Sequence, residues 1–167
     1  MVAEPNREVE MLSKSAIVIG FCVTAGILCV CPSLAETKHV VLVTADEAQR
    51  PLPPDVDLTF RAGVSRGPTI ELLSPKPSEK SVQSPVHLQL KFEGRGGAQI
   101  DVDSLKLTYI RNPAVNLTDR VKEFAKPTGV DVPEAEIPAG MHIIRADLKD
   151  KEGRSGYLIF RINVVNH

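Results

Sequence analysis

Apolar and polar residues alternate in several short runs along the chain, and this period of two is typical of β-strands with one buried face. Alternation is clearest over residues 86–93, where His87, Gln89, Lys91 and Glu93 separate four apolar residues. Similar short runs predict strands over residues 39–44, 69–73, 105–109, 141–149 and 158–164. We expect one face of these strands to form the core: Leu88, Leu90, Phe92, Leu105, Leu107, Ile144, Leu148, Leu158, Phe160 and Ile162.

One segment departs from the period of two. Leu117, Val121 and Phe124 are spaced for one face of a helix, Asn116 is suited to cap its start, and Pro127 follows its end. The pattern therefore predicts one short helix over about residues 116–125 in a fold that is otherwise all β. Strands of this length in one domain favour an antiparallel β-sandwich of about seven strands.

The stretch before this domain is rich in residues that interrupt regular structure. Residues 36–68 contain four prolines, at positions 51, 53, 54 and 68, and the glycines 63 and 67. This composition predicts an extended arm or linker, followed by a sandwich domain over residues 69–167. Leu58 and Phe60 are the residues expected to hold the arm against the domain, although the pattern leaves open whether the arm packs there.

The first part of the chain has the pattern of a secretory signal. Residues 16–30 carry no charge, and fifteen helical residues span about 22 Å, less than the roughly 30 Å of a bilayer core. Pro32 and the sequence Ser33-Leu34-Ala35 follow, which predicts a signal peptide over residues 1–35 that is cut after Ala35. An uncleaved membrane anchor is the alternative, and Pro32 with the small residues after it favours cleavage.

The charges before the apolar run are unusual for a signal peptide. Residues 1–15 contain two basic and three acidic side chains, whereas a start at Met11 leaves the short positive lead Met-Leu-Ser-Lys. We therefore interpret Met11 as the true start. All three cysteines, at positions 22, 29 and 31, lie within or just after the apolar run, so a chain cut after Ala35 has no thiol. None of the three cysteines follows a small residue, which argues against lipidation. From the signal-like segment and the absence of thiols after it, we expect a periplasmic or secreted protein.

The composition argues against several classes of binding partner for the exported chain. The whole sequence has a net charge of -1, and residues 36–167 contain 18 basic and 18 acidic side chains. This balance argues against nucleic-acid binding. Aromatic residues make up 4% of the chain and tryptophan is absent, which argues against a surface that stacks sugars or bases. After signal cleavage we also expect no membrane attachment.

The last predicted hairpin resembles bacterial immunoglobulin-like domains. The segment from Pro138 to Arg154 has Pro-Ala-Gly, then an alternating strand, then Asp-Lys-Glu-Gly-Arg. In that family the strand usually opens with tyrosine and the turn reads Asp-x-x-Gly-Asn, whereas His142 and Arg154 stand at those places here. The resemblance implies an immunoglobulin-like sandwich, and it implies little about function because such domains serve as adhesive, carbohydrate-associated, spacer or docking modules. Gly153 is expected to take the positive φ of this turn.

His142 is the first candidate for chemistry, because it falls on the inward face of its strand. We expect a core histidine whose ring nitrogens bond to neighbouring groups. The other donors for copper or zinc are His39, His87, His167 and Met141, but no pair has ligand spacing, and His87 and His142 should point to opposite sides of the sheet.

Carboxylates are the second set of candidates. Asp101, Asp103, Asp147, Asp150 and Glu152 lie in or near turns and could offer oxygens to calcium, but their spacing does not match an EF-hand. We expect them to cap backbone amides instead.

Two short motifs are candidates for phosphate binding and for glycosylation. The run 94–97 (Gly-Arg-Gly-Gly) lacks the lysine and helix of a phosphate loop and predicts a strand connection. The triplet Asn116-Leu117-Thr118 matches a glycosylation acceptor, which we interpret as a chance match at the helix start.

These observations favour a non-catalytic binding or spacer module acting through protein contacts. We assign no catalytic, cofactor-binding or metal-binding residue, and we expect an envelope or extracellular protein as partner. Docking is expected through an exposed sheet edge or through a long loop region from Arg111 to Pro138, which carries Arg120, Lys122 and Lys126. The alternatives are a periplasmic protein that binds calcium, copper or zinc, and a hydrolase whose site is assembled only in space. The oligomeric state stays open.

Overall fold

A computed structural model describes residues 38–54, 61–62 and 66–166 of the chain. The chain divides into two units, residues 1–34 and 35–167, and every described residue belongs to the second. The predicted signal peptide, the start at Met11, the pair Leu58 and Phe60, and His167 lie outside the described residues. In the described part of the chain, no helix has the length and apolar content needed to cross a bilayer.

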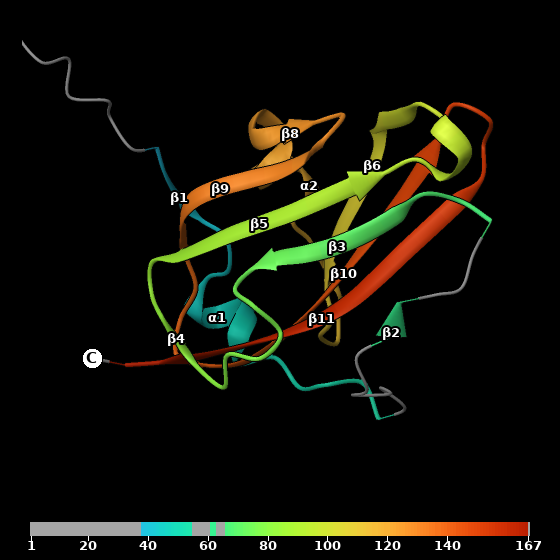
Figure 1. The fold of residues 1–167 in the computed structure, drawn as a ribbon. Coiled ribbons are helices and arrows are strands. Elements are labelled where there is room, and N and C mark those ends of the chain that lie inside the picture. The colour runs from blue at the N-terminus through green and yellow to red at the C-terminus, as the bar shows by residue number, and fades with distance from the viewer. Residues whose placement is uncertain (1–37, 55–60, 63–65, 167) are drawn as a thin grey trace, which may run out of the picture. The chain divides into compact units, whose positions relative to one another are not determined.

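The first sheet contains three long strands, β3 (Thr69–Ser74), β5 (Val86–Glu93) and β9 (Gly129–Glu136). Its order is β1-β9-β5-β3, with the short strand β1 (His39–Val41) at one edge (Figure 1). The two-residue strand β8 (Ala125–Lys126) also pairs with β9. All of these pairings are antiparallel except that of β1 with β9.

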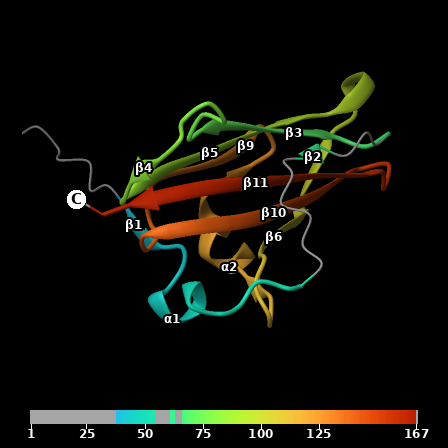
Figure 2. The ribbon, with the colours of Figure 1, turned by 90° about the horizontal axis from the view of Figure 1, so that it is seen from below.

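The second sheet is built around β10 (Gly140–Asp150) and β11 (Ser155–Val165), with β6 (Ile100–Tyr109) and β7 (Val115–Asn116) beyond β10. Two short strands share the outer edge of β11, β2 (Arg61–Ala62) antiparallel and β4 (Val82–Gln83) parallel. Figure 2 shows the two sheets as stacked layers. The all-β sandwich is therefore confirmed, but its sheets are mixed rather than purely antiparallel because of β1 and β4.

The core lies between the two sheets, as the alternation predicted. All ten residues expected there are at most 5% exposed. Alternation follows burial closely in β5, where Val86, Leu88, Leu90 and Phe92 are buried and the residues between them are less so. Burial of one such side chain contributes roughly 1.5–3 kcal/mol, so this interface between the sheets is the main favourable term for the fold.

The expected loop region from Arg111 to Pro138 is wrong, because β9 is an inner strand of the first sheet. Its inward residues are Val130, Val132 and Ala135, which do not follow a strict period of two. A bulge causes this break, since β5 pairs through Val86 with Ala135 and through Leu88 with Val132, so that two residues of β9 oppose one of β5. The bulge contains a proline, which in a sequence reads as the end of a strand.

The predicted helix is present in a shorter form, as α2 (Thr118–Val121) followed by a 3₁₀ turn at Lys122–Phe124. Leu117 and Val121 are buried and Phe124 packs against the core, as the spacing predicted. Asn116 belongs to β7 rather than to the helix cap. Its Oδ1 accepts a hydrogen bond from the backbone N–H of Thr118 at 2.9 Å, which still satisfies one of the free amides at the helix start.

Residues 38–54 of the arm pack on the sandwich. Leu42 and Val43, just after β1, are 0% and 2% exposed and belong to the core. A four-residue helix, α1 (Ala45–Ala48), follows. Thr44 caps it, since the Thr44 side chain accepts from the backbone N–H of Glu47 while the Glu47 carboxylate accepts from the backbone N–H of Thr44. This part of the arm is thus an integral piece of the fold.

Candidate functional site: an apolar groove

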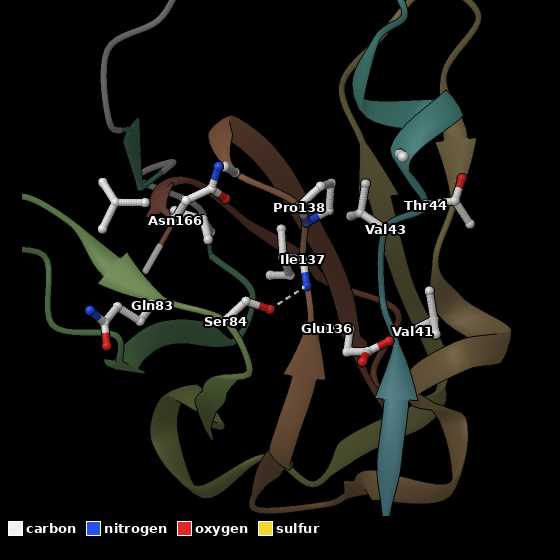
Figure 3. Close-up of a pocket in the computed structure, with 13 residues that line it drawn as sticks. Val41, Val43, Thr44, Gln83, Ser84, Glu136, Ile137, Pro138 and Asn166 are labelled. Atoms are coloured by element: carbon white, nitrogen blue, oxygen red, sulfur yellow. Dashed lines mark hydrogen bonds between the residues drawn. The ribbon is translucent and has the colours of Figure 1, made fainter.

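An open groove of about 480 Å³ lies where β9 leaves the first sheet. The segment from β1 to α1 forms one side of the groove and β4 with the end of β11 forms the other, as Figure 3 shows. The floor is the connection from β9 to β10. The lining residues are Val41, Val43, Thr44, Ala45, Gln83, Ser84, Glu136, Ile137, Pro138, Ala139, Val164, Val165 and Asn166.

Exposed apolar side chains concentrate at this groove. Four large apolar side chains in the described part of the chain are clearly exposed, and two of them, Val41 at 49% and Val165 at 40%, line the groove. The other two, Leu73 and Met141, lie at separate places on the surface. Single exposed apolar residues are ordinary, whereas two that line one hollow beside the buried Ile137 are typical of a contact surface.

Backbone hydrogen bonds hold the walls of the groove in place. The N–H groups of Leu42 and Val43 both donate to the carbonyl of Glu136, at 3.0 and 3.3 Å, which ties the arm to the end of β9. On the opposite side the N–H of Ile137 donates to Ser84 Oγ at 3.2 Å (Figure 3). The floor is therefore linked to both walls, so the groove exists before any partner arrives.

The groove contains one charged lining residue, Glu136. Its side chain is 48% exposed, and its Oε1 lies 3.4 Å from Nδ1 of His39. The remaining polar lining groups are the hydroxyls of Thr44 and Ser84 and the amides of Gln83 and Asn166. These groups can accept or donate hydrogen bonds to a bound polypeptide, and the histidine beside Glu136, His39, is not one of the lining residues.

His142 supports the groove from within the core, as a core histidine with both ring nitrogens bonded. It is 1% exposed; Nε2 lies 2.8 Å from the carbonyl of Pro138 and Nδ1 lies 2.9 Å from Tyr109 Oη. A carbonyl can only accept, so Nε2 carries the proton and Nδ1 accepts from the tyrosine hydroxyl. Burial lowers the pKa of His142, and the nearby Arg111 guanidinium lowers it further despite the bond to Pro138. The ring is therefore neutral and fixes the position of the groove floor.

Arg111 is a buried cation that bonds to backbone. Its guanidinium lies 4.7 Å from the ring of Tyr109 and donates to the carbonyl of Met141 at 2.8 Å, with longer bonds to the carbonyls of Ala48 and Ile110. These contacts join α1 to the start of β10. Arg111 was expected as part of a basic docking surface, but it lies 7% exposed within the fold.

Arg120 likewise serves the fold. Its guanidinium pairs with the Glu47 carboxylate and also donates to the carbonyl of Leu42 at 2.8 Å. The hydrogen bonds from Arg120 lower the pKa of Glu47 from 4.5 to about 2, more than burial raises it. This pair attaches the arm to α2, so two of the basic residues expected on a docking loop hold the arm instead.

The other candidate metal ligands do not converge. Nε2 of His87 lies 2.7 Å from Asp131, on the outer face of the first sheet, while His39 lies beside Glu136. Over residues 38–54, 61–62 and 66–166, no three histidine, cysteine or carboxylate side chains gather in a way that could hold a metal ion.

Of the carboxylates expected to cap backbone amides in turns, Asp150 does so, whereas Asp101 and Asp103 lie within β6 and Asp147 lies within β10. Oδ1 of Asp150 accepts from the backbone N–H groups of Glu152 and Arg154, at 3.0 and 2.9 Å, and Oδ2 accepts from Arg154 Nε at 2.7 Å. Gly153 takes φ of 79°, which confirms the predicted turn. Asp147 pairs with Arg145 at 2.7 Å and Asp101 lies 3.9 Å from Lys151 Nζ.

The glycine run 94–97 connects β5 to β6, as predicted. It forms a single exposed 3₁₀ turn at Arg95–Gly97, with positive φ at Gly96 and Gly97.

A second hollow of about 650 Å³ lies beside β11. Its lining includes Glu79, Lys80, Met141, Arg161 and Asn163. This lining is more strongly charged than that of the groove, with one exposed apolar side chain, so it has less of the character of a contact surface.

Sequence reasoning missed the residues of the groove. Val41 and Val165 are the last residues of β1 and β11, and Ile137 directly follows β9. The one signal in the sequence was the apolar run over residues 40–43, in which apolar residues do not alternate with polar ones. No family model, no curated protein and no solved structure matches the chain.

Proposed function

We propose that this chain is an exported, non-catalytic binding module that contacts another protein through the groove. The observation that carries this proposal is the pair Val41 and Val165, two exposed aliphatic side chains on a pre-formed apolar hollow. The signal-like segment before residue 36 supports export. The near-neutral lining of the groove supports protein contact over catalysis, because general acid–base or nucleophilic chemistry needs paired reactive groups.

An immunoglobulin-like relationship is also part of the proposal, and the strand order supports it. If β3, β5, β6, β9, β10 and β11 are named A, B, C, E, F and G, one sheet reads A-B-E and the other C-F-G. This is the arrangement of the constant-type immunoglobulin sandwich without its strand D. In this chain β1 pairs beside E at the place of strand D, although it runs parallel to E.

Site-specific photo-crosslinking tests the binding role. A photoreactive residue is placed at Val165 in the full chain, expressed in its own host, and the matched control carries it at Leu73, which is similarly exposed on a different surface. We expect a protein adduct from position 165 that is lost when Val41→Lys is added, and no such adduct from position 73. Equal adducts from both positions, or an adduct at 165 that survives Val41→Lys, would contradict the proposal.

A further inference from the structure

The charged groups at the groove are mainly carboxylates, with His39 beside one of them. Glu136 is the charged lining residue, and Asp46 is exposed next to the lining residue Ala45. Glu47, the next carboxylate, is neutralised by Arg120. Lysine and arginine do not occur among the described lining residues, and the basic group beside Glu136 is the ring of His39, whose Nδ1 lies 3.4 Å from the Glu136 carboxylate.

We propose that the groove binds a segment of a partner protein in which aliphatic side chains are followed directly by a lysine or arginine. This inference rests on the proposed binding function and names the chemistry of the partner. The aliphatic side chains would cover Val41 and Val165, which bury apolar surface only when a partner is present. The cation would lie beside Glu136, which is exposed enough to reach and sits at the border of the apolar floor.

The charges at the groove also disfavour the opposite pattern, in which an acidic residue follows the aliphatic ones. An acidic partner residue at the same place would face Glu136 and Asp46 without a basic neighbour in the lining. Opposed like charges disfavour the wrong partner even where the attraction for the right one is modest. A purely cationic partner would leave the apolar floor unfilled, so neither feature alone accounts for the groove.

Nuclear magnetic resonance titration tests this chemistry. The ¹⁵N-labelled chain after the predicted cleavage site, residues 36–167, contains every described residue. It is titrated with three capped tripeptides: Leu-Val-Arg, Leu-Val-Glu and Ser-Ser-Arg. We expect Leu-Val-Arg to shift the amides of Val41, Ile137 and Val165, with roughly threefold to tenfold higher affinity than Leu-Val-Glu, since exposed charge pairs contribute little each. Ser-Ser-Arg should leave these amides unchanged.

Variants separate the two parts of the proposal. Glu136→Gln should equalise the affinities for Leu-Val-Arg and Leu-Val-Glu, whereas Glu93→Gln, a change at an exposed carboxylate on β5, should preserve the difference. Val165→Lys should remove binding of both aliphatic peptides, and Leu73→Lys should retain it.

The outcomes distinguish this inference from the binding function itself. Equal binding of Leu-Val-Arg and Leu-Val-Glu, or binding of Ser-Ser-Arg, would overturn the charge preference while an adduct at position 165 still supported a binding role. Concentration-dependent shifts of the same amides without peptide would identify a second copy as the occupant and overturn the inference. No peptide-induced shift up to about 10 mM, together with no adduct, would overturn both.

Discussion

Arg120 on α2 donates two parallel hydrogen bonds to Glu47 on α1, at 2.8 Å from Nη1 to Oε2 and 2.7 Å from Nη2 to Oε1. The two residues are 73 positions apart in the sequence. Paired bonds of this kind fix orientation as well as distance. The relationship therefore fastens the N-terminal arm, and with it one wall of the groove, to the body of the sandwich.

Breaking this pair should destabilise the fold markedly. Arg120→Gln leaves the Glu47 carboxylate, 8% exposed, without its cation, and we expect a loss of about 3 kcal/mol in the free energy of unfolding. Urea denaturation of the variant and the parent measures this loss. The control is Arg145→Gln, because Arg145 and Asp147 form a pair that is 41% and 34% exposed and should change stability by less than about 1 kcal/mol. Equal losses would show that the arm does not depend on the Glu47–Arg120 pair.

The same pair should make the fold sensitive to acid. The pKa of Glu47 is lowered from 4.5 to about 2 by the hydrogen bonds from Arg120, so the folded state holds the charged form more strongly than the unfolded chain does. The charged Glu47 carboxylate therefore stabilises the folded state by about 3 kcal/mol. This stabilisation is complete above pH 4.5 and declines as the pH falls toward 2. Between about pH 6 and pH 3, the free energy of unfolding should decrease in both proteins, and the decrease should be roughly 2 kcal/mol smaller in Glu47→Gln than in the parent. An identical fall in both proteins would refute this assignment.

His142 should contribute a separate pH dependence at higher pH. Burial lowers its pKa below 6.5, so the folded protein favours the neutral ring and stability is lost as pH falls below 6.5. His142→Phe should flatten the stability profile between about pH 7 and pH 5, and it should cost about 1–3 kcal/mol at neutral pH because Tyr109 and Pro138 lose a hydrogen-bond partner. A stability profile in His142→Phe that falls as steeply as that of the parent between these pH values would contradict this assignment.

Gly129, at the start of β9, should tolerate no side chain. Its φ is 155°, and a Cβ there would lie 2.0 Å from the carbonyl oxygen of Leu90 on β5. We expect Gly129→Ala to destabilise the protein by about 3 kcal/mol, since the strands must separate locally. Gly96→Ala, with positive φ but no atom within 4 Å of the added carbon, should cost about 1 kcal/mol. Comparable thermal midpoints for the two variants would contradict the close approach of β5 and β9.

The sequence predicted most of the sandwich because its strands bury one face each. Leu90 lies between the polar residues Gln89 and Lys91 and is 1% exposed, as is Phe160 on β11. β9 could not be predicted because its bulge at Pro133 and Glu134 shifts the period, and nothing local reveals that β5 and β1 lie on either side of it. α1 carried a readable signal in Thr44 and Glu47, the spacing of a capping box, which the prediction of a strand over residues 39–44 overlooked.

The groove was less predictable than the fold. Its lining comes from the arm, from β4 and from the ends of β9 and β11, which no single sequence window contains. The role of His142 as a core residue did follow from its inward position, whereas its partners Tyr109 and Pro138 depended on how the strands assemble. Exposed apolar residues at strand ends become a site only when the topology brings them together.

The pairing of β1 with β9 has a consequence for how the molecule is made. During synthesis β1 emerges early, but its ladder partner β9 and the arginine that secures the arm come from the second half of the chain. Such widely separated contacts close large loops and slow folding, so the arm should be among the last pieces to dock. Until the arm docks, Leu42 and Val43 remain exposed on the nascent chain, where a chaperone that binds apolar segments can reach them.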